Sequence, residues 1–429
     1  MRRLTAKQLA LAAMVLVLVL GVGGAVSAET VITHFVRGNI NNLRHYEMAL
    51  LEFQKIHPDI DVEFQLVDPN GYTEKLVVRI ASNSAPDVAW SAGGDFHQLA
   101  LAGYLVDLGP YIERDGIDMS MYYPGAVEDG KFNGIQYAMP YQTHPGIHGL
   151  LYNRDLFAFA GLMEPDDQWT WDDLLAAARS ITRDTTGDGV NDIWGYSVIL
   201  GNVESDTMIY SLGGAYTNDA GTESLLATPE TINAYRFFAD MVHEYNVAPT
   251  PSEAPWWGEL FPAGRLGMTL IGPWHLSGFI GGTMPFDVGV ANIPIGPGGR
   301  VAGGPSTDLY VILAQGKNAE AAWEWVKFLT SEEGLRIQTE FLSNPTPLNS
   351  VNGFLLEKYG AYYDPFIDGL INGTYRGFAT HNYKGTRARQ IVFDGVQPIW
   401  TGQEPPETAL LNAHRLLSAL LEEPMEAGW

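Results

Sequence analysis

Strand-like and helix-like segments alternate along the N-terminal part of the chain. Residues 30–35 and 60–67 have the pattern of strands, the second through its alternation of apolar and polar residues. Each is followed by a segment with the helical spacing of apolar residues, first 43–56 and then 72–81. Because alternating strands and helices pack as a sheet covered by helices, this order predicts an α/β fold with a mostly parallel sheet.

The rest of the chain continues the mixture of strands and helices. Residues 86–90 have the character of a buried strand, and 93–105 indicate a loop that leads into a helix. Further strands are expected at 134–139, 149–152, 193–200, 266–271, 286–292 and 309–313, and further helices at 171–181, 228–244, 318–329, 331–342 and 408–421. No repeat, low-complexity tract or linker interrupts the sequence, which favours interwoven lobes over two domains on a tether.

The first 28 residues have the layout of a secretory signal peptide. A basic start with Arg2, Arg3 and Lys7 is followed by an apolar run over residues 9–20. Small residues then lead up to Ala28, after which we expect cleavage. A membrane anchor is the alternative, but the apolar run is shorter than the roughly 20 residues that span a bilayer. The sequence therefore predicts export, and a soluble periplasmic or secreted protein after cleavage.

Composition excludes several classes of protein. No cysteine occurs in the 429 residues, which excludes a disulfide framework, a thiolate metal site, a catalytic thiol and a lipid-modified N-terminal cysteine. The formal net charge is −25 and becomes more negative once the basic signal segment is removed. Nucleic acid is not an expected partner, because binding to phosphates requires clustered cations. The same charge disfavours anionic membrane surfaces.

Several segments resemble, in the same order, the extracellular solute-binding proteins of ABC importers, in particular the sugar-binding family that includes maltose-binding protein. Residues 53–62 (FQKIHPDIDV) resemble a helix end, a proline and the second strand of that family, and residues 85–105 resemble its segment from a Pro-Asp pair to a Gly-Leu turn. Residues 152–157 (YNRDLF), 169–174 (WTWDDL) and 267–274 (GMTLIGPW) are similar to three further signatures. The resemblance covers nearly all of the mature chain.

The resemblance implies two α/β lobes, each a mostly parallel sheet flanked by helices, with three hinge crossings near Tyr137, Thr307 and Ile367. The N-terminal lobe would contain residues 29–137 plus 308–367, and the C-terminal lobe residues 138–307 plus 368–429. The resemblance also implies a monomeric, non-enzymatic protein of the periplasm. It would capture a sugar by hinge closure, since only the closed form makes all contacts, and deliver it to the membrane subunits of an ABC importer.

Polar side chains follow the expected strands of the first lobe. Arg37 and Asn39 come just after the first strand and Asp95 just after the third, at the carboxyl ends where open α/β sheets bind ligands. Asp95 also fits the N-cap of the helix that follows it. These three residues are candidates for ligand binding.

Two further groups of candidates lie near the expected crossings. Tyr141, Thr143 and His144 follow the strand before the first crossing and precede a Pro-Gly pair, which places them at the mouth of the cleft. Solvated loop residues are the alternative, and His144 fits that alternative somewhat better. Ser306 and Asp308 lie in the second crossing.

Sugar recognition combines aromatic faces with planar polar groups. Trp274 stands at a strand end, where the resemblance implies a stacking tryptophan; a core position is the alternative. Trp256 and Trp257 are adjacent and cannot both face one core, so one of them is expected to face the cleft. Glu204 lies in a loop that can face the ligand. Arg387 would bind a charged ligand or form a surface salt bridge, which is the commoner fate.

The segment DTTGDGVND resembles a calcium loop, with oxygen donors at alternate positions. The donors would be Asp184, Thr186, Asp188 and Asp192. The segment departs from the pattern in its third residue and at Gly195, where an EF-hand presents a bidentate glutamate. A plain Asp-Gly turn explains the same residues. Structural calcium is therefore a hypothesis, and no other cofactor is expected.

Two other functions are compatible with the sequence. A secreted carbohydrate-active hydrolase would use paired carboxylates in an aromatic cleft, although the chain has no G-x-S-x-G, H-E-x-x-H or G-x-x-x-x-G-K motif. The second possibility keeps the fold and binds a phosphorylated or otherwise charged polyol, such as glycerol phosphate. Arg37, Arg387 and Arg389 motivate it.

Overall fold

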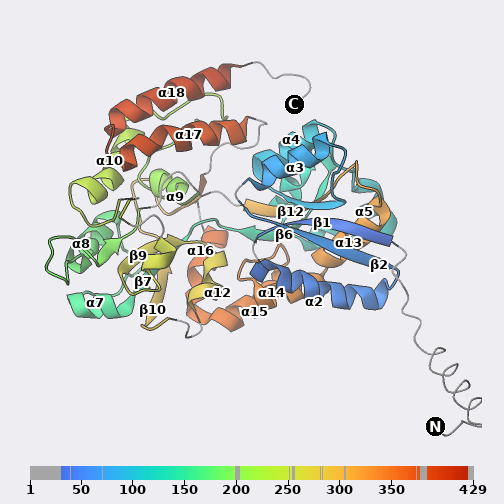
Figure 1. The fold of residues 1–429 in the computed structure, drawn as a ribbon, viewed down its shortest axis with the longest axis horizontal. Coiled ribbons are helices and arrows are strands. Elements are labelled where there is room, and N and C mark those ends of the chain that lie inside the picture. Colours follow the sequence, from blue (N-terminus) through green and yellow to red (C-terminus); the bar gives the residue numbers. More distant parts are fainter. Residues whose placement is uncertain are drawn as a thin grey trace, which may run out of the picture.

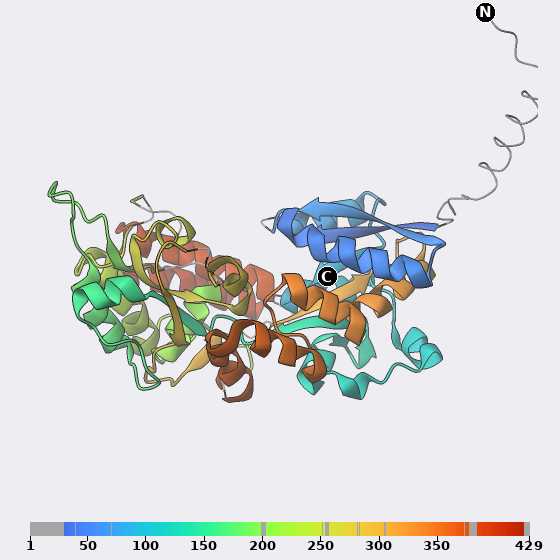
Figure 2. The same cartoon turned by 90° about the horizontal axis from the view of Figure 1, so that it is seen from below.

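The computed structural model describes residues 30–423 apart from 39, 70, 199–202, 251, 254–256, 281, 283, 304–305, 373 and 377–383. It contains two lobes side by side, each built on one β-sheet with helices on its faces (Figure 1 and Figure 2). The expected signal peptide lies outside the described residues. Within them, no helix is both long enough and apolar enough to span a bilayer.

The first lobe is built on a five-stranded sheet. Its strands are, in spatial order, β2 (Ile60–Val67), β1 (Thr30–Arg37), β3 (Val88–Ser91), β12 (Ser306–Ile312) and β6 (Ala138–His144). β1 is parallel to β2 and β3, whereas β12 is antiparallel to β3 and β6. A short hairpin of β4 (Lys131–Phe132) and β5 (Ile135–Gln136) precedes β6.

The second lobe is built on a four-stranded sheet. Its strands are, in spatial order, β10 (Val288–Asn292), β7 (Gly149–Asn153), β9 (Leu266–Ile271) and β8 (Trp194–Tyr196). β7 is antiparallel to β10 and β9, and β8 is parallel to β9. A separate parallel pair joins β11 (Val301–Gly303) to β13 (Thr374–Arg376).

One strand in each sheet, β12 in the first and β7 in the second, is antiparallel to both of its neighbours. The chain reaches each of these two strands directly after crossing from the other lobe. β7 follows β6 after residues 145–148, and its first residue, Gly149, pairs with Ile271 at the end of β9. In the same way, Ser306 at the start of β12 pairs with His144 at the end of β6. The chain therefore enters each sheet at the edge where the other strands end. The carboxyl edges of the two sheets consequently face each other.

Helices cover both faces of the first sheet. One face packs against α2 (Ile40–Ile56), α5 (Gly109–Asp115), α13 (Ala319–Thr330) and α14 (Glu332–Phe341), and the other against α3 (Tyr72–Ala81) and α4 (Gly93–Leu101). A 3-10 turn at Met119–Met121 and α6 (Pro124–Asp129) complete the lobe. Figure 1 shows α3 and α4 on the opposite side of the sheet from α2 and α14.

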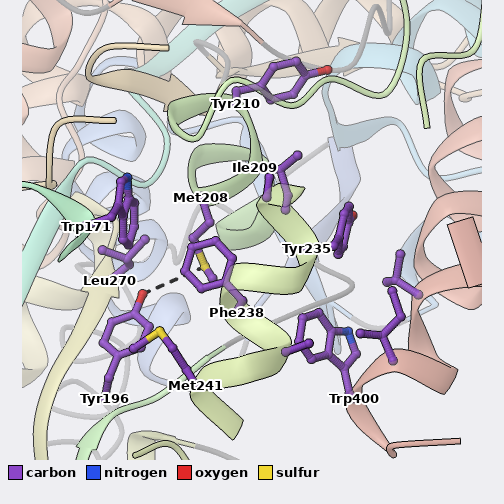
Figure 3. Packing of buried hydrophobic residues seen from close by; sticks show 14 of the residues in the cluster. Trp171, Tyr196, Met208, Ile209, Tyr210, Tyr235, Phe238, Met241, Leu270 and Trp400 are labelled. Atoms are coloured by element: carbon purple, nitrogen blue, oxygen red, sulfur yellow. Dashed lines mark hydrogen bonds between the residues drawn. The ribbon is translucent and has the colours of Figure 1, made fainter. Parts of the chain in front are cut away.

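Helices also cover both faces of the second sheet. The larger cluster includes residues of α7 (Arg154–Ala160), α8 (Trp171–Ile181), α9 (Val203–Ser211), α10 (Pro229–His243), α17 (Gly385–Trp400) and α18 (Pro406–Glu422). Figure 3 shows its aromatic centre, where Trp171 meets Phe238 edge to face with ring centroids 5.3 Å apart. The other face packs against α11 (Trp257–Leu260), α12 (Leu276–Phe279), the 3-10 turn Gly360–Tyr363 and α16 (Asp364–Asn372).

The crossings between the lobes differ in position from two of the three that the resemblance implies. β6 pairs within the first sheet as far as His144, so the first crossing is at residues 145–148 rather than near Tyr137. The second enters β12 at Ser306, beside the expected Thr307. The third runs through α15 (Asn349–Tyr359), ahead of Ile367, because Val351 packs in the first lobe and Leu355 in the second.

The best-predicted elements have strong local signals. β2, α3, α8 and β9 have the bounds expected from sequence. At the start of α8, Asp173 N donates to Thr170 Oγ1 and Thr170 N donates to Asp173 Oδ2, which completes a capping box. The sheets confirm the α/β fold with mostly parallel strands.

Candidate functional site

The facing edges of the two sheets form the candidate site. From the first lobe, β1 and β3 end there, and β12 begins there opposite the end of β6. From the second lobe, β9 ends at Ile271, and the 3-10 turn Pro273–His275 follows directly. Carboxyl ends of strands in open α/β sheets are the usual place for ligands, because loops and helix N-termini gather there.

The end of β1 places an arginine on a tryptophan. The guanidinium carbon of Arg37 lies 4.5 Å from the centre of the Trp90 ring, which is half-buried near the end of β3. Such a contact is worth about 0.5–1 kcal/mol where it is exposed. Asp95, in the first turn of α4, accepts a hydrogen bond from Thr73 Oγ1 at 2.6 Å. Both expected residues of this edge therefore lie beside partners in the first lobe.

Tyr141 faces the core of the first lobe. Its ring stacks on Tyr310 with centroids 4.0 Å apart and planes 14° apart. Burial raises the pKa of both phenols well above the usual value, so both remain protonated. Tyr310 Oη in turn donates to Tyr46 Oη at 3.0 Å. Tyr141 belongs to β6 and Tyr310 to β12. The stack therefore joins the two strands that carry the polar residues of the site.

Polar side chains continue the site along β6 and β12. Thr143 and Thr307 are both buried, with their hydroxyl oxygens 3.4 Å apart. Thr307 Oγ1 donates to Asp129 Oδ2 at 2.5 Å. These bonds tie α6 to the two strands, so this part of the edge is preorganised.

His144 joins the two lobes. Its Nε2 lies 4.0 Å from Asp308 Oδ2 in the first lobe, and its ring meets Trp274 of the second lobe with centroids 4.9 Å apart. The whole residue is 7% exposed, so His144 is not the solvated loop residue considered above. Burial lowers its pKa, and the Asp308 carboxylate opposes that shift. An aromatic ring, an imidazole and a carboxylate are thus brought together between the lobes.

Trp274 is partly exposed, while Trp257 is not. Trp274 Nε1 donates to His275 Nε2 at 3.2 Å, which orients the indole. Trp257 is 4% exposed and packs against His275 and Phe279 in a hydrophobic cluster. Of these two tryptophans, Trp274 is the one that the structure places at the facing edges.

The second lobe adds a buried carboxylate. Asp206 on α9 is 2% exposed, and its Oδ2 lies 3.2 Å from Arg389 Nη1 on α17. Burial raises the pKa of Asp206, and the charge of Arg389 opposes that shift. Arg387 is exposed and forms an ion pair with Glu423, 3.0 Å from Nη1 to Oε2. Nearby, α17 contacts α4 of the first lobe.

Some expected residues lie outside the described part of the chain. This applies to Asn39 and Trp256, and to the side chains of Glu204 and Ser306. Sequence reasoning missed Trp90 and Asp129. Trp90 lies near the end of β3, on the same edge as Arg37. That position is a signal in the sequence, but the apolar character of the strand concealed it.

In the segment expected to bind calcium, backbone amides already donate hydrogen bonds to the carboxylate oxygens. Asp184 Oδ2 accepts from Gly189 N and Oδ1 accepts from Gly187 N, each at 2.7 Å, and these bonds lower the pKa of Asp184. Asp192 Oδ2 accepts from Thr185 Oγ1 at 2.5 Å. Asp188 Oδ1 bonds to an amide within the same loop, and Thr186 Oγ1 donates to Asp184 Oδ1. Calcium binding at this loop stays a prediction.

Close packing against α8 explains why residue 195 is a glycine. A Cβ at this position would lie 2.2 Å from the carbonyl oxygen of Ala178 on α8. A glutamate, as in an EF-hand, cannot be accommodated there without moving that helix.

The two sheets, three crossings and polar interlobe edge define a solute-binding protein. The chain belongs to the family of bacterial extracellular solute-binding proteins, whose model matches residues 45–335.

Curated relatives of several kinds are similar to the chain. A putative binding protein of Brucella abortus is 26% identical over 402 residues, 88% of this chain and 90% of the relative. The maltotriose-binding protein of Pyrococcus abyssi is 25% identical over 309 residues, 71% of this chain and 63% of the relative. The sn-glycerol-3-phosphate-binding periplasmic protein of Brucella melitensis is 25% identical over 395 residues, 84% of this chain and 87% of the relative.

Solved structures share the fold over nearly the whole chain. An ABC substrate-binding protein of Listeria monocytogenes in complex with cycloalternan has a TM-score of 0.80 at 24% identity, covering 91% of this chain and 98% of the other. A solute-binding protein of Thermotoga lettingae bound to α-D-tagatose has a TM-score of 0.78 at 22% identity, covering 91% and 100%. At these identities the likeness establishes the two-lobed fold.

Proposed function

We propose that this chain is the substrate-binding component of an ABC importer and captures a sugar between its lobes. The observation that carries the proposal is Trp274, a partly exposed indole at the facing edges, beside His144 and the Asp308 carboxylate. Aromatic faces cover the C–H faces of sugar rings, and carboxylates accept hydrogen bonds from hydroxyls. The maltotriose-binding relative and the two carbohydrate complexes of the same fold support this ligand class.

The mechanism is capture by closure, without chemistry on the ligand. A sugar that touches Trp274 in one lobe and Asp308 in the other makes all its contacts only when the lobes are together, so it favours the closed form. The closed form then presents both lobe surfaces to the membrane subunits of the importer. The proposal includes export to the periplasm or the medium, with cleavage of the signal peptide after Ala28. The mass of the mature protein tests this cleavage site.

A charged polyol is the second candidate, favoured by the glycerol-phosphate-binding relative. The three arginines that would hold its phosphate already have partners. Arg37 lies over Trp90, Arg389 beside Asp206, and Arg387 beside Glu423. Asp308 would repel a phosphate nearby. We therefore propose a neutral sugar in preference to a phosphorylated ligand.

Thermal unfolding in the presence of candidate ligands tests the proposal. Maltotriose, cycloalternan, tagatose and glycerol 3-phosphate would be compared, because a ligand at 100 times its Kd stabilises the folded protein by about 2.7 kcal/mol. We expect a rise in Tm with at least one neutral sugar. A rise with glycerol 3-phosphate alone would show that the second candidate is right, and conversion of a sugar to products would show an enzyme.

The variant Trp274→Ala connects the binding to the site. Loss of the indole is expected to weaken sugar binding by about 2 kcal/mol, roughly 30-fold, as for a central aromatic contact. Phe159→Ala is the control, because this side chain is 73% exposed on α7, outside the facing edges. Titration calorimetry measures both. Equal affinities for the two variants would contradict the assignment of Trp274.

A further inference from the structure

α16, the helix that follows the third crossing, touches the first crossing where the chain enters the second lobe. Residues 145–148 connect β6 to β7, and α15 leads through a 3-10 turn into α16. Gly369 of α16 lies against the ring of His148: a Cβ at this glycine would be 2.6 Å from His148 Cδ2 and 3.0 Å from Pro145 Cβ. Real Cβ atoms do not come so close to other heavy atoms, so the approach of the helix to the crossing depends on a glycine.

The ring of His148 is held by packing. It has no exposed surface, and neither ring nitrogen has a hydrogen-bond partner in the part of the chain that the structure describes. Burial lowers its pKa to about 4, so the ring is neutral near pH 7. A buried polar ring without hydrogen bonds is costly, so the ring acts at the crossing through its shape and its packing contacts.

Further contacts fix the same crossing on two sides. A Cβ at Gly149 would lie 2.7 Å from Cζ of Phe366, which is on α16 one turn before Gly369. On the other side, Thr207 Oγ1 of α9 donates to the carbonyl oxygen of Ile147 at 2.9 Å. α16 therefore cannot shift at Gly369 without disturbing the whole first crossing.

We propose that the contact between Gly369 and His148 is a hinge clamp, which couples the first crossing to the helix that follows the third and thereby sets the balance between the open and closed forms. The proposal rests on the proposed function in that the lobes close on a ligand. A methyl group at residue 369 would have to move about 1 Å away from the ring to reach ordinary contact distance. Because α16 is joined by the short turn Gly360–Tyr363 to α15, whose Val351 packs in the first lobe, we expect this displacement to change the angle between the lobes.

The absence of cysteine allows the angle to be measured directly. A pair of introduced cysteines, Lys55→Cys in the first lobe and Asp219→Cys in the second, both at exposed positions, carries fluorophores for single-molecule energy transfer. In the ligand-free protein we expect Gly369→Ala to shift and broaden the distribution of lobe separations. This readout does not depend on which ligand is bound.

Gly125→Ala is the matched control. Gly125 is also a helix residue, in α6 of the first lobe and outside the three crossings, but a Cβ there would meet no atom within 4 Å. Replacing glycine by alanine within a helix stabilises it by up to about 1 kcal/mol, so Gly125→Ala is expected to raise Tm slightly and leave the distribution unchanged. Gly369→Ala is expected to lower Tm in spite of the same gain in helix propensity. Identical distributions for the two variants overturn the proposal.

The double variant His148→Ala/Gly369→Ala tests the contact itself. Removing the ring makes room for the methyl group, so the double variant is expected to recover the wild-type distribution, and failure to recover it overturns the proposal. If Gly369→Ala does not fold, His148→Ala alone decides: the clamp predicts a broadened distribution, and an unchanged one overturns it.

Ligand binding separates this proposal from the proposed function. If a sugar binds the wild-type protein, Gly369→Ala is expected to bind it about tenfold more weakly or worse, and affinity equal to that of Gly125→Ala overturns the clamp. If no sugar binds but the distribution of Gly369→Ala is shifted, the clamp stands and the sugar assignment fails.

Discussion

Asp87 is a buried carboxylate that holds three segments of the first lobe together. Its Oδ2 accepts from Thr33 N at 2.8 Å and from Thr33 Oγ1 at 3.0 Å, while its Oδ1 accepts from Lys317 N at 2.8 Å and Asn318 N at 3.1 Å. The first two bonds fix β1, and the other two fix the start of α13. One side chain therefore aligns a strand with the helix that covers it.

Asp87→Ala is expected to reduce the free energy of unfolding by about 3 kcal/mol, because it leaves several backbone donors without an acceptor. Asp107→Ala is the control, since Asp107 accepts one exposed bond, from Gly109 N, and its loss is expected to cost under about 1 kcal/mol. Urea unfolding followed by tryptophan fluorescence measures both. A similar small loss for the two variants would contradict the role of Asp87.

For single residues, the sequence predicts which positions lie at the site better than it predicts which way each side chain points. Arg37, Thr143, His144 and Asp308 all lie at the facing edges, because strand ends are readable from local pattern. The sequence predicts Tyr141 and one of Trp256 and Trp257 at the cleft, yet Tyr141 and Trp257 pack in hydrophobic clusters. Whether an aromatic ring turns to the core or the cleft depends on distant partners such as Tyr310, which no local pattern contains.

Among the elements, α8 shows how a local signal specifies a helix end. The capping box of Thr170 and Asp173 satisfies amides that the first turn cannot pair. Thr170→Ala is expected to lower the free energy of unfolding by about 1 kcal/mol. In Ser180→Ala, the control on the same helix, only a bond to the carbonyl of Ala176 is lost, and stability is expected to stay the same or rise. Urea unfolding of both variants checks this, and equal midpoints would contradict it.

α15 shows the opposite case. It was not expected from sequence, although it spans eleven residues. Val351 packs in the first lobe, whereas Leu355 and Tyr359 pack in the second. A helix that passes between two cores has no single apolar stripe, so the periodicity that reveals α3 and α8 is absent from it. The same reason explains why the third crossing was expected too late in the chain.

For the whole molecule, buried imidazoles predict a loss of stability in mild acid. Burial lowers the pKa of His34 and of His45 to about 3, from 6.5. Between these values the unfolded chain binds protons that the folded chain does not, so the free energy of unfolding falls as pH drops below 6.5 and levels off near pH 3. Each histidine contributes a slope of about 1.4 kcal/mol per pH unit in that window.

Unfolding measured from pH 7 to pH 5 checks this prediction, in a window above the usual range of carboxylates. His45→Leu is expected to have a shallower pH dependence than the wild type, because one group that must stay unprotonated is removed. His97→Gln is the control, since His97 bonds to the carbonyl of Gly93 at the surface. An unchanged slope in His45→Leu would contradict the assignment.

The position of β12 has a consequence for how the chain acquires its structure. β12 pairs with β3 on one side and with β6 on the other, and residues 145–305 separate it from β6 along the chain. The first sheet therefore cannot be completed until most of the second lobe has been synthesised, and such long-range pairing is slow. A chain stopped before Ser306 is expected to lack the protected amides of β3 and β6 in hydrogen exchange. Slow completion of the sheet also leaves the polypeptide without its finished first lobe for longer after synthesis.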